Sequence, residues 1–169
     1  FETSRPQVLT DSSRVKMFIN EVHSGINGLS SPYTGKNVVV GIVDDGIDFR
    51  HPDLQDASGK TRVLHFWDQK IDSVGKPNIP SPYNYGLEYD SSTINKHIIS
   101  DQGPSPLYVG LGGQGLHGTI VTGIGTGNGL ADGRNRGIAP DSKIIFVRTN
   151  FSKENWSLTV ADACDYIFK

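Results

Sequence analysis

A buried strand that ends at two adjacent carboxylates is the feature that most constrains this chain. Residues 37–55 read NVVVGIVDDGIDFRHPDLQ, in which a run of β-branched residues leads directly into Asp44 and Asp45. A run without polar alternation is typical of a strand buried on both faces, as in a parallel sheet. Ligand sites of open α/β sheets lie at the carboxyl ends of such strands. The stretch therefore predicts a parallel sheet with Asp44 at its functional edge.

The residues of this stretch leave three interpretations open. A carboxylate at a strand end costs desolvation unless a partner is present, so Asp44 or Asp45 could cap a following turn or helix. The two residues could instead hold a metal ion together with His51 and Asp53. In the third interpretation, Asp44 belongs to a ligand-binding or active site at the strand end.

Further along the chain, expected strands alternate with expected helices. Strands are predicted over residues 37–43, 61–69 and 143–149, and helices over 11–25, 91–100, 117–124 and from 157 onward. Residues 73–89 and 101–115 are rich in Pro, Gly and Ser and are predicted to be loops. The alternation predicts an α/β fold with a parallel sheet and right-handed crossovers.

Two of the expected helices contain side chains whose environment can be predicted. An apolar stripe at helical spacing runs through residues 11–25, formed by Val15, Phe18, Ile19 and Val22. Gly25 is a suitable residue to end that helix. In the last helix, Cys164 is expected to be a small core residue. It is the only cysteine, which excludes an internal disulfide framework.

Composition and charge exclude several classes of function. The net charge of −2 and the pI of about 6.2 favour neither nucleic acid nor anionic lipid as a partner. No apolar run approaches the roughly 18 residues needed to span a bilayer.

The 169 residues begin at Phe1 and end at Lys169 inside a helical pattern, so we expect both ends to be interruptions of a longer chain.

The second informative stretch is GQGLHGTIVTGIGTGNG, residues 113–129. His117 would lie in the first turn of a helix, where the partial positive charge disfavours imidazolium, so we expect a neutral, basic ring. A histidine at a helix start is also typical of a solvated cap or a packing residue. The glycines of GIGTGNG, residues 123–129, and of GLGGQG, residues 110–115, match phosphate-binding loops weakly, because neither clearly links a strand to a helix.

Taken together, the two stretches resemble the Asp and His signatures of the subtilisin-like serine proteases, the subtilases. VVVGIVDDGIDFRHPDL is similar to the strand, Asp and His-Pro-Asp-Leu pattern of the family, and HGTIVTGI to its His-Gly-Thr pattern. GIAPDSKIIFVRT resembles the turn and strand that follow there. The resemblance extends over about residues 30–168. It implies part of a three-layer α/β fold, with a mainly parallel sheet and helices on both faces.

The resemblance also implies a placement in one branch of the family, and three residues depart from the usual signatures. Residues 61–69 and 86–95 are similar to a bacterial branch that includes clostridial spore-germination proteases. Asp45 stands where most subtilases have Ser or Thr, as in the kexin-like branch. Ile120 and Thr122 replace a histidine and an alanine of the usual signature, changes that we expect to affect mainly packing.

The functional roles come from the resemblance, residue by residue. Asp44 would be the aspartate and His117 the general base of an Asp-His-Ser triad that hydrolyses peptide bonds. The distance between them, 73 residues, is longer than usual and predicts a surface insertion over residues 57–112. The family's serine has no counterpart here, since Ser142, Ser152 and Ser157 lack its sequence context. No oxyanion-hole asparagine can be assigned either.

The expected organisation is therefore an N-terminal portion of a subtilase catalytic domain, residues 1–169, with residues 1–36 as an N-terminal segment. The serine-bearing part of the same protease, on the same or a separate chain, is the expected partner, and a protein or peptide is the expected substrate. Without that part, this chain would be inactive. The chemistry requires no cofactor; calcium is common in the family, but its ligands cannot be assigned here. The resemblance favours a secreted or cell-envelope location.

Two alternatives stay open at the level of sequence. A non-catalytic relative could keep Asp44 and His117 while lacking the serine. A metal-dependent hydrolase or a nucleotide-binding module would use the carboxylates or the glycines in other ways.

Overall fold

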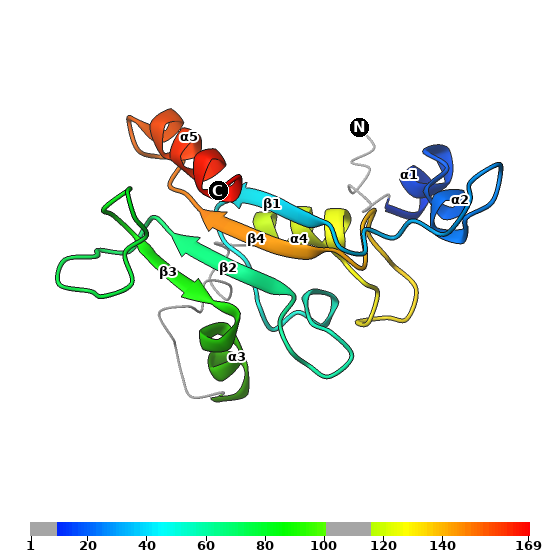
Figure 1. The fold of residues 1–169 in the computed structure, drawn as a ribbon, viewed down its shortest axis with the longest axis horizontal. Helices are drawn as coiled ribbons and strands as arrows, with labels where there is room; N and C mark the ends of the chain where they lie inside the picture. The colour runs from blue at the N-terminus through cyan, green and yellow to red at the C-terminus, as the bar shows by residue number, and fades with distance from the viewer. Residues whose placement is uncertain (1–9, 101–115) are drawn as a thin grey trace, which may run out of the picture.

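A four-stranded, mainly parallel sheet forms the centre of the molecule in a computed structural model that describes residues 10–100 and 116–169 (Figure 1). The strand order is β1-β4-β2-β3. The three parallel strands are β1 (Val39–Asp44), β4 (Lys143–Arg148) and β2 (Val63–Asp68), and β3 (Leu87–Asp90) runs antiparallel to β2. The predicted α/β class with a mainly parallel sheet is confirmed.

Helices α4 (Leu116–Thr126) and α5 (Trp156–Ile167) lie against opposite faces of this sheet. Side chains of a strand alternate between the two faces, so residues an odd number of positions apart point in opposite directions. The Cβ of Asp44 faces Gly118 of α4, whereas the Cβ position of Gly41 faces Ile167 of α5. The sheet is therefore the middle of three layers, as expected.

Each face of the sheet has its own apolar cluster. The cluster on the α4 side contains the fully buried Phe66 and Phe146, together with Ile94 of α3 (Ser91–Ser100). It also includes Leu54 of the short 3-10 helix Pro52–Leu54. The cluster on the α5 side is centred on Trp67 of β2. Residues of β2 and β4 belong to these clusters, so their packing fixes the positions of the two strands and of Asp68 and Arg148 at their ends.

The N-terminal helix differs from its prediction. The single helix expected over residues 11–25 is two short helices, α1 (Thr10–Lys16) and α2 (Ile19–Ser24). Phe18 lies between them in the left-handed conformation, which interrupts the helical hydrogen bonding. Val15 and Phe18 are mostly exposed, so the predicted stripe is not buried in the described part of the chain. Gly25 ends α2 in the left-handed conformation, as expected.

Two strand predictions also need correction. Strand β1 is not buried on both faces within the described residues, because burial increases along it from the half-exposed Val39 to the buried Asp44. It is also the edge strand of the described sheet. Strand β3 lies mostly inside residues 73–89, which were expected to be a loop, because its pairing with β2 outweighs the surrounding Pro and Gly. Strands 61–69 and 143–149 and the helix over residues 91–100 are found as predicted, whereas residues 101–115 lie outside the described range.

The burial of Cys164 and of residues 57–112 also differs from the prediction. Cys164 is exposed rather than part of the core, because α5 contacts the sheet through Ala163 and Ile167. The predicted surface insertion, residues 57–112, contains β2, whose Phe66 and Trp67 are completely buried, so this range contributes to the core. Among the helices that the structure describes, none is both long and apolar enough to cross a bilayer.

Candidate active site

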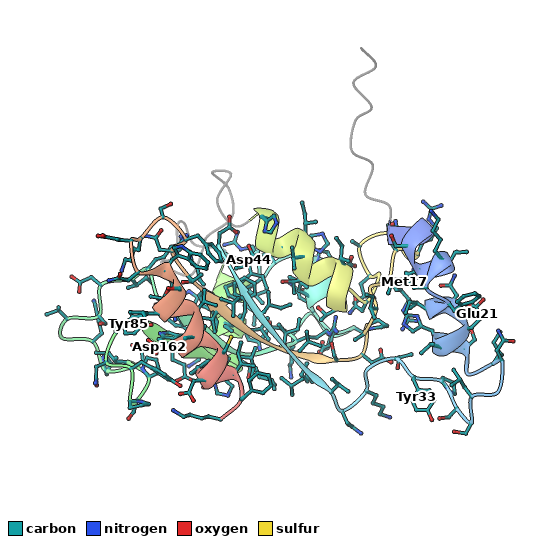
Figure 2. All side chains as sticks on the ribbon, turned by 90° about the horizontal axis from the view of Figure 1, so that it is seen from above. Met17, Glu21, Tyr33, Asp44, Tyr85 and Asp162 are labelled. Atoms are coloured by element: carbon teal, nitrogen blue, oxygen red, sulfur yellow. The ribbon has the colours of Figure 1, made fainter. Side chains whose placement is uncertain are left out.

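Asp44 is the last residue of β1 and its side chain is directed toward the start of α4 (Figure 2). The residue is 7% exposed. Its Oδ1 accepts a hydrogen bond of 2.8 Å from the backbone N–H of Asp45. A nearly buried carboxylate needs such partners, because desolvation disfavours its charged form.

The first turn of α4 packs directly against the end of β1. Gly118 faces the carbonyl oxygen of Gly46 and the Cβ of Asp44 at distances that leave no room for a larger side chain. Thr119 Oγ1 accepts a hydrogen bond of 2.8 Å from the backbone N–H of Asp48. These contacts fix the helix start against the turn that follows β1, and they place the side chain of His117 beside Asp44.

The imidazole of His117 is hydrogen bonded to Asp44 through Nδ1. The distances from Nδ1 to Oδ1 and Oδ2 are 2.9 Å and 3.0 Å. The predicted proximity of two residues 73 positions apart is therefore present. The carboxylate fixes the tautomer with a proton on Nδ1, which leaves Nε2 of the exposed ring as the basic nitrogen.

The surroundings of His117 include a second influence besides the helix start considered in the sequence. The hydrogen bond to Asp44 and the negative charges of Asp44 and Asp45 raise the pKa of His117 above its ordinary value of 6.5. The partial positive charge of the helix terminus acts in the opposite direction. The nearby carboxylates outweigh it, because a full opposite charge at hydrogen-bond distance is a stronger influence than half a charge.

Asp45 is joined to α4 and to two cations. Its Oδ1 accepts a hydrogen bond of 3.3 Å from the N–H of Gly118, so the capping interpretation holds for this residue. Its carbonyl oxygen accepts hydrogen bonds from Arg148 Nε at 3.1 Å and Lys70 Nζ at 3.3 Å. Burial, followed by the charge of Arg148, lowers the pKa of Lys70.

Three residues near Asp45 were not predicted from the sequence. Lys70 and Arg148 contact the Asp45 carbonyl, and Asp68 contacts both of these residues. A signal for two of them was present, because Asp68 and Arg148 end the strands β2 and β4. The carboxyl ends of parallel strands meet at one edge of the sheet, so both were candidates to accompany Asp44.

The predicted metal site of Asp44, Asp45, His51 and Asp53 is not brought together. His51 Nδ1 accepts a hydrogen bond from the backbone N–H of Asp53, and Asp53 Oδ1 accepts one from Ala131. Within the described ranges, the one group of three or more potential metal ligands is Asp44, Asp45 and His117, with ligand atoms within 4.8 Å of one another.

The glycine and serine motifs do not form a second site in the described residues. Most of GIGTGNG forms the end of α4, where the Gly127 N–H donates to Gly123 and the Gly127 carbonyl accepts from Gly137. GLGGQG lies outside the described range. Ser142 is fully buried and donates to the carbonyl of Ala139, so its hydroxyl has a structural partner.

Comparisons with known proteins give a consistent result. The model of the subtilase family matches residues 35–168. The proprotein convertase subtilisin/kexin type 6 of Rattus norvegicus is 45% identical over 65 residues, which are 38% of this chain and 6% of that protein. A PII-type proteinase of Lacticaseibacillus paracasei is 27% identical over 139 residues, which cover 78% of this chain and 6% of that protein.

Among solved structures, the CspB protease of Clostridium perfringens is similar to this fold with a TM-score of 0.69 and 26% identity. The match covers 92% of this chain and 29% of the CspB chain. The described fold therefore corresponds to less than a third of that protein and to about 6% of the curated relatives named above.

Proposed function

The chain belongs to the subtilase family, and from that membership we propose that it supplies Asp44 and His117 to the Asp-His-Ser triad of a serine endopeptidase. The single observation that supports these roles is the pairing of His117 Nδ1 with both carboxylate oxygens of Asp44. In triads of this type, the aspartate holds the base in the correct tautomer and stabilises the imidazolium that forms.

The proposed reaction is peptide hydrolysis in two steps. A serine hydroxyl attacks the peptide carbonyl carbon while His117 Nε2 takes its proton, and the carbonyl oxygen becomes negatively charged. His117 then gives the proton to the leaving amine as the C–N bond breaks, and an acyl-enzyme remains. Water, activated by the same nitrogen, hydrolyses the acyl-enzyme and restores the serine. Asp44 keeps its negative charge throughout.

The serine and the oxyanion donors would come from a further part of the same protease. Strand β1 is the edge of the described sheet, so its outer side can pair with another strand. Several large apolar side chains near this edge and on the two covering helices are exposed: Val39, Ile120, Ile124 and Leu158. We therefore propose a serine-bearing polypeptide segment as the partner. From the family membership we also propose a protein or peptide as the substrate and a secreted or cell-envelope location.

A metal-dependent reaction has one observation in its favour, the proximity of Asp44, Asp45 and His117. However, the ring nitrogen nearest the carboxylates is Nδ1, and a metal ion there would displace its proton and the hydrogen bonds to Asp44. Calcium prefers six to eight oxygen ligands, so this group does not resemble a calcium site. The proposed chemistry uses no cofactor, and structural calcium remains without assigned ligands.

The experiment is mutation of His117 in the complete protease. We expect His117→Ala to reduce kcat by about 10⁶-fold, as removal of the base does in subtilisin. His65→Ala is a matched control, because His65 Nδ1 also contacts a carboxylate, Glu88 Oε1 at 2.7 Å, on the other side of the sheet. Near-normal activity of His117→Ala would refute the role of general base.

Inhibitors distinguish the remaining alternatives. A serine-directed fluorophosphonate should abolish hydrolysis, and a chelator should leave the chemical step intact. Loss of activity with the chelator alone would favour the metal-dependent hydrolase. A complete protein that has no hydrolytic activity and does not react with the fluorophosphonate would be a non-catalytic relative.

A further inference from the structure

We propose that Arg148, held in place by Asp68, is a positioning residue that orients the Asp45 peptide and thereby the pair formed by Asp44 and His117. The inference rests on the proposed function in so far as Asp44 and His117 are the catalytic pair. It concerns residues that take no part in the chemical steps described above.

The sheet places Arg148 between two carboxylates. In the register of the parallel strands, Arg148 of β4 is the direct neighbour of Asp44 on β1 and of Asp68 on β2. Residues paired in this way in a parallel sheet point to the same face. The guanidinium of Arg148 therefore lies on the side of the sheet that contains His117.

Asp68 fixes the position of the guanidinium. The contact from Arg148 Nη1 to Asp68 Oδ2 is 2.9 Å, and Asp68 is completely buried. The second oxygen of Asp68, Oδ1, accepts a hydrogen bond of 2.9 Å from the backbone N–H of Lys70. With both carboxylate oxygens engaged, Asp68 has little freedom to move, and it holds the planar group of Arg148 in one orientation.

Arg148 in turn holds the peptide unit between Asp45 and Gly46, the second one after the candidate catalytic aspartate. Its Nε donates to the carbonyl oxygen of Asp45 over 3.1 Å, and the Nζ of Lys70 donates to the same oxygen over 3.3 Å. The N–H of Asp45 donates to Asp44 Oδ1, and the Asp45 carboxylate accepts from the N–H of Gly118. Asp45 thus links the Arg148 guanidinium to both the carboxylate of Asp44 and the start of the His117 helix.

Stability alone does not account for this arrangement. A buried ion pair is often no more stabilising than apolar side chains of similar volume, because two charges must be desolvated. The specific benefit of Arg148 is geometric, since its fork of donors reaches Asp68 and the Asp45 carbonyl at the same time. A lysine in its place keeps the charge but has a single ammonium on a flexible stem.

The test uses Arg148→Lys in the complete protease. We expect kcat to fall by about 10-fold to 100-fold, the effect of a small misplacement of reacting groups, with KM changed by less than about 2-fold. Proton NMR of the His117 Nδ1–H provides a second measurement, because this resonance reports the hydrogen bond to Asp44 directly. We expect it to move upfield or broaden in the variant.

Arg62→Lys is the matched control. Arg62 is also a buried arginine, directly before β2, and it donates to the carbonyls of Asp53, Thr126 and Ser142, none of which contacts Asp44 or His117. Its replacement should lower the unfolding temperature and leave both kcat and the His117 resonance unchanged. Equal effects of the two variants on kcat and resonance would mean general loosening and would overturn the proposal.

The remaining outcomes are also decisive. A folded Arg148→Lys protein with wild-type kcat and an unchanged resonance would overturn the positioning role. Should Arg148→Lys not fold, Asp68→Glu provides the same comparison, because it keeps the charge and displaces the carboxylate by one methylene. If the complete protein does not hydrolyse peptides, the proposed function fails, yet the resonance still tests whether Arg148 orients the pair.

Discussion

Gly118 approaches Gly46 so closely that a Cβ atom on Gly118 would overlap the carbonyl oxygen of Gly46. The same atom would lie 3.0 Å from the Cβ of Asp44. A glycine after His117 is therefore a steric requirement for bringing the start of α4 onto the end of β1. The contact between two candidate catalytic residues depends on a neighbour that performs no chemistry.

We predict that Gly118→Ala lowers kcat of the complete protease by about 100-fold, because the added methyl group displaces His117 from Asp44 by a fraction of an ångström or more. It should also destabilise the fold by about 1–3 kcal/mol through overpacking. Steady-state kinetics and denaturant unfolding measure the two effects.

Gly123→Ala is the control within the same helix. A Cβ atom there has no neighbour within 4 Å in the described part of the chain, and alanine is the better helix former. We expect unchanged kcat and a stability gain of about 0.4–1 kcal/mol. If both substitutions leave kcat unchanged, the close approach of α4 is not what positions His117.

The proximity of Asp44 and His117 was anticipated from the resemblance to the subtilases, whereas the two local patterns, a strand that ends in Asp and a helix that begins with His, predicted only the two elements and their ends. The sheet edge then brings the two ends together. Asp68 and Arg148 were missed because their importance depends on strand order. The order β1-β4-β2 places Arg148 between Asp44 and Asp68, and no local pattern specifies that order.

The pH dependence of hydrolysis should reflect the carboxylates beside His117. The general base must be neutral, and Asp44 and Asp45 raise the pKa of His117. We therefore expect kcat/KM to decline, as the pH is lowered, already above the ordinary histidine value of about 6.5. In Asp44→Asn the acid limb should move to lower pH while the maximal rate falls by about 10⁴-fold. An acid limb that stays in place would contradict the assignment of that limb to His117.

The raised pKa of His117 also makes the free energy of unfolding depend on pH. Because the folded protein raises the pKa of His117, the contact with Asp44 stabilises the fold fully below the unfolded pKa. Its contribution is lost as the pH rises through the raised pKa. Unfolding measured against pH in wild type and His117→Ala should show this difference.

Asp45 should matter less than Asp44. Its carboxylate caps α4 through a hydrogen bond of 3.3 Å to Gly118, whereas its backbone is what contacts Arg148 and Lys70. We expect Asp45→Asn to reduce kcat by less than about 10-fold, because the side-chain oxygen of Asn can still accept the cap hydrogen bond from Gly118 and only the negative charge is lost. A loss as large as that of Asp44→Asn would mean that the wrong carboxylate has been assigned to the triad.

Two tyrosines of residues 69–86, Tyr83 and Tyr85, donate hydrogen bonds to carboxylates of α5, and their contributions to stability can be measured separately. Tyr85 Oη donates to Asp162 over 2.8 Å (Figure 2). It also accepts a hydrogen bond from Gln69 Nε2. We expect Tyr85→Phe to destabilise the fold by about 1–2 kcal/mol, because a part-buried carboxylate loses a hydrogen bond. Tyr83→Phe, which breaks an exposed hydrogen bond to Asp165, should cost less than about 1 kcal/mol. Equal values in denaturant unfolding would argue against a specific clamp at Tyr85.

The burial of individual side chains was less predictable than the elements that contain them. Cys164 and Ala163 are adjacent small residues in one helix, yet Ala163 is buried and Cys164 is exposed. Consecutive helical residues are about 100° apart, so a small change in how α5 sits on the sheet exchanges their environments. The packing of α5 against the sheet decides which of the two residues is buried, and that packing depends on the whole fold.

The final prediction is that residues 1–169 do not behave as an independent monomer. Strand β1 is the edge of the described sheet, and the β-branched sequence of that strand suits a position inside a sheet. Exposed apolar side chains on both sides of it, among them Ile120 on α4 and Leu158 on α5, provide a surface of the kind that associates or aggregates. Sedimentation of the isolated chain at micromolar concentration should therefore show self-association. Addition of the serine-bearing part should replace it by a single complex, whose interface would resemble a core cut in two. A monodisperse monomer that unfolds cooperatively and binds no such part would show that the exposed edge is compatible with a complete domain, and the partner proposal would then be wrong.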